Sequence, residues 1–154
     1  MEIQIKEMPE LRLASLRHVG PYNRISETFA KVGAIAGPAG LYQYPEAAMV
    51  AVYHDDPETT PPDALRSDAA VSVPKQAEMP KGLTEVRLPA GRYACATHIG
   101  PYTGLGDAWA RFMGEWLPAS GNRAGQGLGY EIYRNNPTNT APGALRTELY
   151  LPLA

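Results

Sequence analysis

The sequence reads His18-Val19-Gly20-Pro21-Tyr22, and 80 positions later it reads His98-Ile99-Gly100-Pro101-Tyr102. The segment Ala64-Leu65-Arg66 returns at the same offset as Ala144-Leu145-Arg146. Seventeen of the 74 residue pairs separated by 80 positions are identical, whereas ordinary residue usage gives about five matches by chance. We infer that the chain contains two copies of one supersecondary unit, and that the boundary between them is a natural place for a binding site.

The repeat sets the expected domain organisation. The two copies span residues 1–74 and 81–154, and the segment 74–81 links them. A single copy would bury only a marginal core, whereas the whole chain of 154 residues, 44% of them hydrophobic, can bury a substantial one. We therefore expect one domain over residues 1–154 rather than two independent ones.

Hydrophobic periodicity in the first copy predicts a hairpin followed by a helix. Ile3 and Ile5 alternate with polar residues, and a second strand over residues 11–19 is expected to pair with this first strand. Gly20-Pro21 then suits the start of a helix, because proline in the first helical turn loses no hydrogen bond. The other expected elements are a helix with Ile25, Phe29 and Val32 that stops at Gly37-Pro38, strands 48–53, 68–73, 83–88, 92–99, 128–133 and 147–153, and a second helix with Leu105, Trp109, Phe112 and Trp116.

These elements define the predicted fold class. Two ββαββ-type modules give an α+β domain with antiparallel sheets and one main helix in each module. A pseudo-twofold axis would relate the modules, and we expect a ligand cleft between the two halves.

Comparing the two copies strand by strand singles out Glu131. Side chains alternate between the faces of a strand, so Ala51 and Tyr53 share a face, and their counterparts in the second copy are Glu131 and Tyr133. A carboxylate thus replaces a methyl group at one position of the repeat. The opposite face is apolar in both copies, and we expect it to pack on the helix. Its residues are Val50, Val52, Tyr130 and Ile132.

Two interpretations of Glu131 remain open. It is either a half-exposed glutamate on a solvated sheet face or a carboxylate that binds a ligand. In the second case it would lie in a concave, aromatic-lined cleft suited to a flat, apolar, cationic molecule, because aromatic faces attract cations and the carboxylate supplies a counter-charge. The tyrosines expected to line this cleft with Glu131 are Tyr133, Tyr150, Tyr93 and Tyr53.

Several segments together resemble the GyrI-like small-molecule-binding family. They are Val50-Ala51-Val52-Tyr53-His54-Asp55-Asp56-Pro57, His18-Val19-Gly20-Pro21-Tyr22 and Tyr130-Glu131-Ile132-Tyr133-Arg134-Asn135-Asn136. The resemblance runs from about Ile3 to Leu153. It implies a duplicated ββαββ-type fold, which also serves as the effector-binding domain of AraC-type and MerR-type regulators.

The same resemblance has consequences for Glu131. In the relatives, a glutamate from the third strand of the second module reaches into the ligand pocket, and Glu131 matches that position. Family members include regulators, stand-alone binders, DNA gyrase inhibitors and hydrolases of cyclopropane-bearing toxins. This chain contains no helix-turn-helix segment, so we expect it to act alone and not as a transcription factor.

Composition argues against several other functions. A net charge of −2 with scattered Lys and Arg residues argues against direct nucleic-acid binding. The sequence shows no signal peptide and no apolar run long enough to span a membrane, and its one cysteine, Cys95, fits a reducing compartment, so we expect a cytoplasmic protein. The three histidines lack metal-ligand spacing. No metal and no cofactor are assigned.

Three function classes follow. The first is a non-catalytic protein that binds amphipathic or cationic compounds and inhibits gyrase or protects it from toxins. The second is a hydrolase of cyclopropane-bearing genotoxins, in which a buried Glu131 of raised pKa would act with Tyr133 or Tyr150. The third is an interaction module that contacts gyrase through the loops at 54–67 and 134–146. The sequence leans away from an enzyme.

Two tryptophans on the second predicted helix could be taken for ligand-stacking groups. Trp109 and Trp116 share their helical face with Leu105 and Phe112, which favours packing in the hydrophobic core. Trp109 also matches Phe29 in the repeat. We therefore interpret both tryptophans as core residues.

Overall fold

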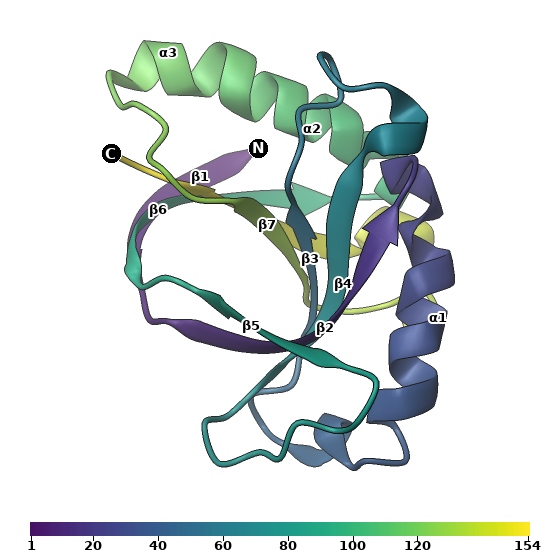
Figure 1. Cartoon of the computed structure of the whole chain (residues 1–154). Helices are drawn as coiled ribbons and strands as arrows, with labels where there is room; N and C mark the ends of the chain where they lie inside the picture. Colours follow the sequence, from purple (N-terminus) through teal and green to yellow (C-terminus); the bar gives the residue numbers. More distant parts are fainter. The chain divides into compact units, whose positions relative to one another are not determined.

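The computed structural model describes residues 1–154. The chain divides into two compact units: unit 1 comprises Met1–Pro9 and Ala90–Ala154, and unit 2 comprises Glu10–Pro89. Figure 1 shows the course of the chain through both. In each unit four antiparallel strands are combined with helical segments. The predicted α+β class with antiparallel strands is therefore confirmed, whereas the duplication of a module stays a prediction.

Unit 2 contains four strands in the order β3-β4-β2-β5 and one long helix. Helix α1 packs against β2 and β4 (Figure 1). A hydrogen bond of 2.8 Å between His18 Nδ1 and Thr28 Oγ1 ties β2 to this helix. The elements are β2 (Leu11–Val19), η1 (Tyr22–Arg24), α1 (Ile25–Ala36), η2 (Leu41–Gln43), β3 (Met49–Tyr53), η3 (Pro62–Ala64), β4 (Arg66–Val73) and β5 (Thr84–Leu88).

Unit 1 contains four strands in the order β1-β6-β8-β7. Its hydrophobic core joins alanines and leucines of β6 and β8 to Ala108 and Phe112 of the helical stretch. The elements are β1 (Glu2–Met8), β6 (Gly91–Ile99), η4 (Tyr102–Gly104), α2 (Leu105–Arg111), η5 (Phe112–Trp116), α3 (Leu117–Ser120), β7 (Gly129–Tyr133), η6 (Pro142–Ala144) and β8 (Arg146–Pro152).

The predicted hairpin between the first two strands is wrong. β1 pairs over its whole length with β6, from Glu2 opposite Thr97 to Met8 opposite Gly91, and β2 pairs instead with β4 and β5. Hydrophobic alternation identifies a strand but carries no information about its partner. The compact units consequently differ in their bounds from the sequence repeats.

The helix-facing side of the third strand in each repeat is also the opposite of the predicted one. In unit 1, Glu131 lies opposite Leu149, and Leu149 packs against Ala108 and Phe112 of the helical stretch. Glu131 therefore lies on the face that the helix covers, and Tyr130 and its neighbours face the other way. The prediction failed because both faces of β7 are buried. An apolar face in the sequence is therefore not necessarily the face that meets the helix.

Two prolines at equivalent repeat positions have different effects on the helices. Helix α1 ends at Ala36, just before Gly37-Pro38. In unit 1 the helix continues past Pro118, and the turn before it widens to the π-helical segment η5, where the Leu117 N–H bonds to the Phe112 carbonyl. Because Pro118 has no N–H to donate to the preceding turn, the helix accommodates it by this local widening.

The loop between β3 and β4 is fastened by an ion pair of Asp55 with Arg66. The carboxylate accepts hydrogen bonds from the Arg66 backbone N–H at 2.8 Å and from its guanidinium at 2.9 and 3.0 Å. These bonds from Arg66 lower the pKa of Asp55 from 3.8 to about 2. In unit 1 the matching Asn135 accepts the Arg146 backbone N–H at 2.8 Å.

Replacing Asp55 with Asn should make the acid-induced loss of stability shallower. A carboxylate whose pKa is lowered by folding stabilises the folded protein at pH above its ordinary pKa of 3.8, and that contribution disappears as the pH falls toward about 2. The asparagine has no such proton-linked contribution. Urea unfolding of both proteins across this window measures the difference, and equal slopes would contradict this role of Asp55.

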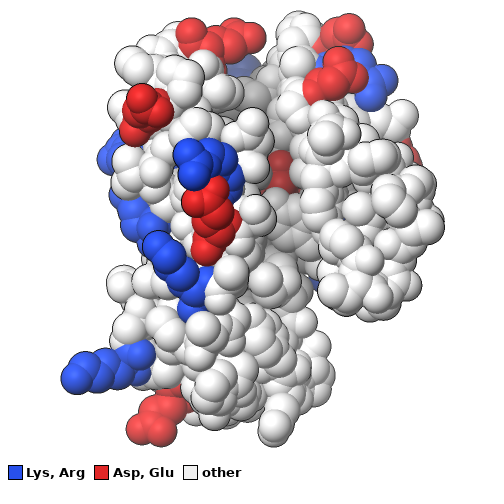
Figure 2. All heavy atoms as spheres, turned by 90° about the vertical axis from the view of Figure 1, so that its right-hand side faces the viewer, with Lys and Arg blue, Asp and Glu red and all other residues white.

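Charged side chains of both signs are interspersed on the molecular face in Figure 2, and most of that face is uncharged. Surface ion pairs between residues close in sequence, such as Arg24 with Glu27 and Arg111 with Asp107, are consistent with this mixture. None of the helices is both long and apolar enough to cross a membrane. The expected cytoplasmic location stays a prediction.

Candidate functional site

The site is built around the carboxylate of Glu131 in the middle of β7. Its strand reads Gly129-Tyr130-Glu131-Ile132-Tyr133, and the central three residues are buried. Glu131 itself is only 1% exposed. This exposed fraction excludes the predicted alternative of a half-exposed, solvated glutamate. A buried carboxylate costs free energy unless other groups compensate it.

Two donors hold the two oxygens of this carboxylate. The Trp109 indole Nε1–H donates to Oε1 at 2.7 Å, and the Tyr133 hydroxyl donates to Oε2 at 2.6 Å. Hydrogen bonds to an ionised acceptor are short and strong, and both donors favour the charged form of the carboxylate. The arrangement fixes the positions of both carboxylate oxygens at the centre of the strand.

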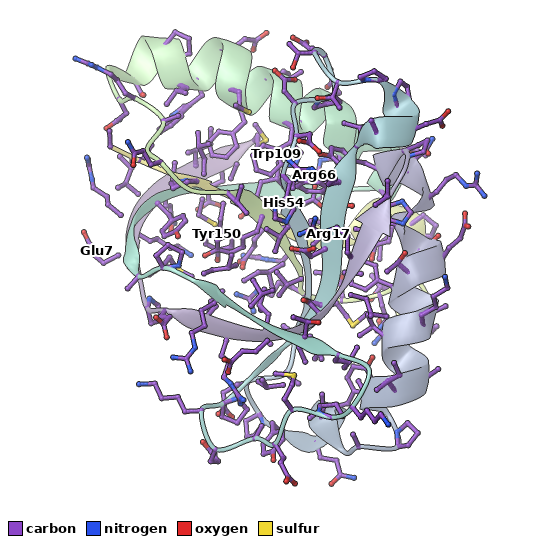
Figure 3. The ribbon with its side chains drawn as sticks, viewed as in Figure 1. Glu7, Arg17, His54, Arg66, Trp109 and Tyr150 are labelled. Carbon is purple, nitrogen blue, oxygen red and sulfur yellow. The ribbon has the colours of Figure 1, made fainter.

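Trp109 reaches the carboxylate from helix α2. Figure 3 shows its side chain on the side of α2 that faces the strands. The ring packs against the hydrophobic core of unit 1 and lies 5.8 Å from the ring of Phe112. Trp109 is thus a core residue, as interpreted from the sequence, and in addition a hydrogen-bond donor to Glu131.

Tyr102 connects this site with the protein surface. Its ring lies 5.4 Å from the ring of Tyr133 in an edge-on arrangement, and its side chain is 37% exposed. Burial, and then the negative charge of Glu131, raise the pKa of Tyr102 above its ordinary value. The influence of Glu131 on this hydroxyl means that Tyr102 lies within electrostatic range of the carboxylate.

The structure divides the five predicted site residues into three groups. Glu131 and Tyr133 lie together on the helix-facing side of β7. Tyr150 belongs with Tyr130, since these two residues are paired across β7 and β8 on the opposite side of the strands. Tyr93 lies near Tyr150 on that opposite side, and Tyr53 belongs to unit 2. The predicted grouping of Tyr150 and Tyr93 beside Glu131 is therefore wrong, because alternation places them on the other face.

Tyr93, Tyr130 and Tyr150 form a buried aromatic cluster of their own. The Tyr130 and Tyr150 rings stack at 4.9 Å with 13° between their planes, and Tyr93 approaches Tyr130 edge-on at 5.5 Å. Burial raises the pKa of both Tyr130 and Tyr150. These hydroxyls stay protonated in ordinary buffers and act as neutral packing groups.

A second buried carboxylate, Glu148, lies on the same face as this aromatic cluster. It accepts hydrogen bonds from Arg134 at 2.6 Å, from the Tyr150 hydroxyl at 3.0 Å and from Arg146 at 3.4 Å. Burial raises its pKa, but Arg134 and the other donors outweigh burial and lower the pKa overall. Glu148 is therefore an ionised carboxylate whose charge is compensated inside unit 1.

Unit 2 repeats this compensated carboxylate with different partners. Asp68 Oδ1 accepts a hydrogen bond from Arg17 Nε–H at 2.7 Å, and Asp68 Oδ2 lies 2.6 Å from His54 Nε2. Arg17 and His54 are both labelled in Figure 3. The ring of Tyr53 contacts that of Tyr22, with 4.7 Å between centroids. His54 thus contacts the buried carboxylate of Asp68, which its loop position in the sequence did not reveal.

Two residues of the Glu131 site were missed from the sequence. The difference between Phe29 and Trp109 was a signal. The second copy has both the indole N–H donor and the carboxylate of Glu131, whereas the first copy has neither. Tyr102 was part of the quoted repeat motif, but no role was assigned to it. Contacts between a helix and a distant strand decide both roles, and one sequence does not contain them.

Comparisons with known proteins identify the family and the fold. The family model described as the GyrI-like small molecule binding domain matches residues 1–154. A protein named DNA gyrase inhibitor from Yersinia enterocolitica is 31% identical over 155 residues, which cover 97% of this chain and 96% of that relative.

Two solved structures share the fold. The EcmrR C-terminal domain superposes with a TM-score of 0.76 at 20% identity and covers 99% of this chain and 97% of that one. SAV2435, solved bound to tetraphenylphosphonium, superposes with a TM-score of 0.70 at 13% identity and covers 100% of this chain and 94% of that one. At these identities the likeness shows the fold alone.

Proposed function

The chain belongs to the GyrI-like family of small-molecule-binding domains, and from this premise we propose that it binds amphipathic or cationic small molecules at Glu131. The resemblance inferred from the sequence is confirmed by the family match and by the curated relatives named DNA gyrase inhibitor. The observation that carries the proposal is the buried Glu131 carboxylate, which accepts hydrogen bonds from Trp109 of helix α2 and from Tyr133 of strand β7.

The chemistry of these side chains favours a cationic ligand. An ionised carboxylate attracts a positive charge strongly where water is scarce, and the faces of tyrosine and tryptophan rings attract cations while adding apolar contact area. A structural relative, SAV2435, was solved with tetraphenylphosphonium, a bulky aromatic cation of this kind. This supports the choice of ligand class.

We propose Glu131, Tyr133, Trp109 and Tyr102 as the residues of the binding site. They are joined by the hydrogen bonds to Glu131 and by the ring contact of Tyr102 with Tyr133. Contact of a ligand with Tyr150, Tyr93 or Tyr53, and the cleft between the two halves of a duplicated fold, stay predictions.

The curated relatives suggest a biological purpose for binding. Curated relatives carry the name DNA gyrase inhibitor. We propose that this chain either inhibits gyrase or removes compounds that harm gyrase. A supercoiling assay with purified gyrase, run with and without the protein, tests the first of these. Unchanged supercoiling at a large excess of protein would reject gyrase inhibition and leave ligand capture.

Calorimetric titration of the wild-type protein should show that charge decides binding. Tetraphenylphosphonium should bind at least tenfold more tightly than neutral triphenylphosphine oxide, which offers similar aromatic surface without the positive charge. Anionic tetraphenylborate should bind more weakly still. Equal affinity for the three compounds, or no binding of any, would contradict the proposal.

Mass spectrometry of the ligand separates a binding protein from the predicted alternative of a hydrolase. A DNA-alkylating cyclopropane compound is incubated with the protein, and its mass is followed over time. An unchanged mass of the compound agrees with a non-catalytic binding protein. A gain of one water that depends on Glu131 would instead show that the protein is a hydrolase. Binding through surface loops alone would leave both experiments without a Glu131-dependent signal.

A further inference from the structure

Glu131 is not the only difference between the repeats on this face of the strands. Three positions differ between the copies, and in unit 1 they contact one another in turn: Gly129 lies against Trp109, and Trp109 donates a hydrogen bond to Glu131. A methyl group becomes a carboxylate, a phenyl ring becomes an indole, and a long side chain becomes a hydrogen atom. The pairs, unit 2 first, are Ala51 and Glu131, Phe29 and Trp109, and Met49 and Gly129.

Gly129 makes room for the tryptophan ring. A Cβ atom built on Gly129 would lie 3.2 Å from Cη2 and 3.6 Å from Cζ3 of Trp109, and the first of these contacts is tighter than ordinary van der Waals packing. The indole therefore lies directly on the backbone of β7, two residues before Glu131. Even a Cβ atom at position 129 would require the ring to shift by a few tenths of an ångström, and a branched side chain would require more.

The ring position matters because the indole N–H is one of the two donors to Glu131. A glutamate has three side-chain torsions, and fixing them costs free energy at the moment of binding unless the protein has fixed them beforehand. Trp109 holds Oε1 from the helix and Tyr133 holds Oε2 from the strand. The carboxylate is thus oriented before any ligand arrives.

We propose that Gly129 and Trp109 are positioning residues, which fix the direction of the Glu131 carboxylate toward a bound cation. The inference rests on the proposed function for its consequence in binding, but its structural basis can be tested without a ligand. Trp109 acts through its N–H and Gly129 acts through the space it leaves. In this role both residues act through Glu131.

Replacing Trp109 with Phe should weaken tetraphenylphosphonium binding about tenfold, because the variant keeps a ring on the core but loses the donor. Trp116→Phe is the matched control, since Trp116 packs against the same hydrophobic core and donates no hydrogen bond to Glu131 in the structure. The two variants should have similar thermal stability. Equal affinity of wild type and Trp109→Phe would overturn the positioning role of Trp109.

The pH dependence of binding gives a readout that simple loss of packing would not change. Cation binding should disappear as the pH falls and Glu131 takes up a proton. Removing one donor to the ionised form should move the midpoint of this loss to a higher pH in Trp109→Phe. An unchanged midpoint would mean that the indole N–H does not act on the carboxylate. Circular dichroism at each pH confirms that the proteins remain folded.

Gly129→Val should reproduce the effect of Trp109→Phe, because its side chain displaces the indole from the strand. Met49→Val in unit 2 is the matched control at the equivalent strand position and should bind like wild type. Combining Gly129→Val with Trp109→Phe should cost little more than either change alone, since both remove the same hydrogen bond. Additive losses would mean that Gly129 acts by another route.

Nuclear magnetic resonance tests the positioning directly and without any ligand. The chain has two tryptophans, so two indole N–H signals are expected, and Trp116→Phe assigns them. The Trp109 signal should shift in Glu131→Gln and in Gly129→Val, whereas the Trp116 signal should stay in place. A stationary Trp109 signal overturns the inference even if cations bind. If the wild-type protein binds no cation while this signal shifts, the proposed function fails and the positioning of Glu131 stands.

Discussion

Replacing Glu131 with Gln should weaken tetraphenylphosphonium binding between tenfold and a hundredfold. The substitution keeps the size of the side chain and an oxygen that can accept from Trp109, but it removes the negative charge. A cation held about 5 Å from a carboxylate gains about 3 kcal/mol at the effective dielectric typical of protein sites, which corresponds to about two orders of magnitude in affinity. Isothermal titration calorimetry of both proteins under identical buffer conditions measures the loss.

Two comparisons make this result specific. Binding of neutral triphenylphosphine oxide should change by less than twofold in the same variant, because that ligand has no charge for Glu131 to attract. Glu148→Gln supplies a control carboxylate, since Glu148 is already compensated by Arg134 and Arg146 on the opposite face. Equal losses for the cation and the neutral compound would point to a distorted site and would refute the charge mechanism.

Replacing Phe112 with Ala should lower the free energy of unfolding by about 3–5 kcal/mol, as is typical for emptying a buried aromatic position. Phe112 is fully buried in the core of unit 1, and its ring lies 5.8 Å from Trp109 and 5.6 Å from Trp116. Removing it leaves a cavity beneath the helix that carries Trp109. For a chain of this length, the melting temperature should fall by roughly 10 °C.

The neighbouring Met113 provides the matched control. It belongs to the same segment, η5, but is 47% exposed, so Met113→Ala should change the free energy of unfolding by less than about 1 kcal/mol. Urea denaturation followed by circular dichroism measures both variants. A Phe112→Ala protein as stable as Met113→Ala would show that the core beneath the helix contributes little to the fold.

Glu131 could be singled out from one sequence because the repeat provided an internal comparison. Ala51 in the first copy shows what the strand needs for structure alone, so the carboxylate at the matching position stood out. The comparison could not identify its neighbours on the folded chain. Tyr150 seemed equally suitable because it also lies on a strand of the second copy, yet pairing opposite Tyr130 places it on the other face.

The amino-acid sequence by itself determined the class of this protein and singled out Glu131 as the candidate site residue. Periodicity and the 80-residue offset identified strands, helices and their order, because these depend on local spacing of side chains. Short segments of the sequence likewise indicated the Glu131 position and the family resemblance.

Only the tertiary structure decided which strands pair and which face meets the helix. β1 joins β6 and not β2, and Glu131 turns toward Trp109 and away from the tyrosine cluster. Both outcomes come from contacts between residues far apart in sequence, where hydrogen bonding of every strand edge and burial of two apolar faces must be satisfied at once. Local patterns leave several such arrangements open, and packing of the whole unit selects one.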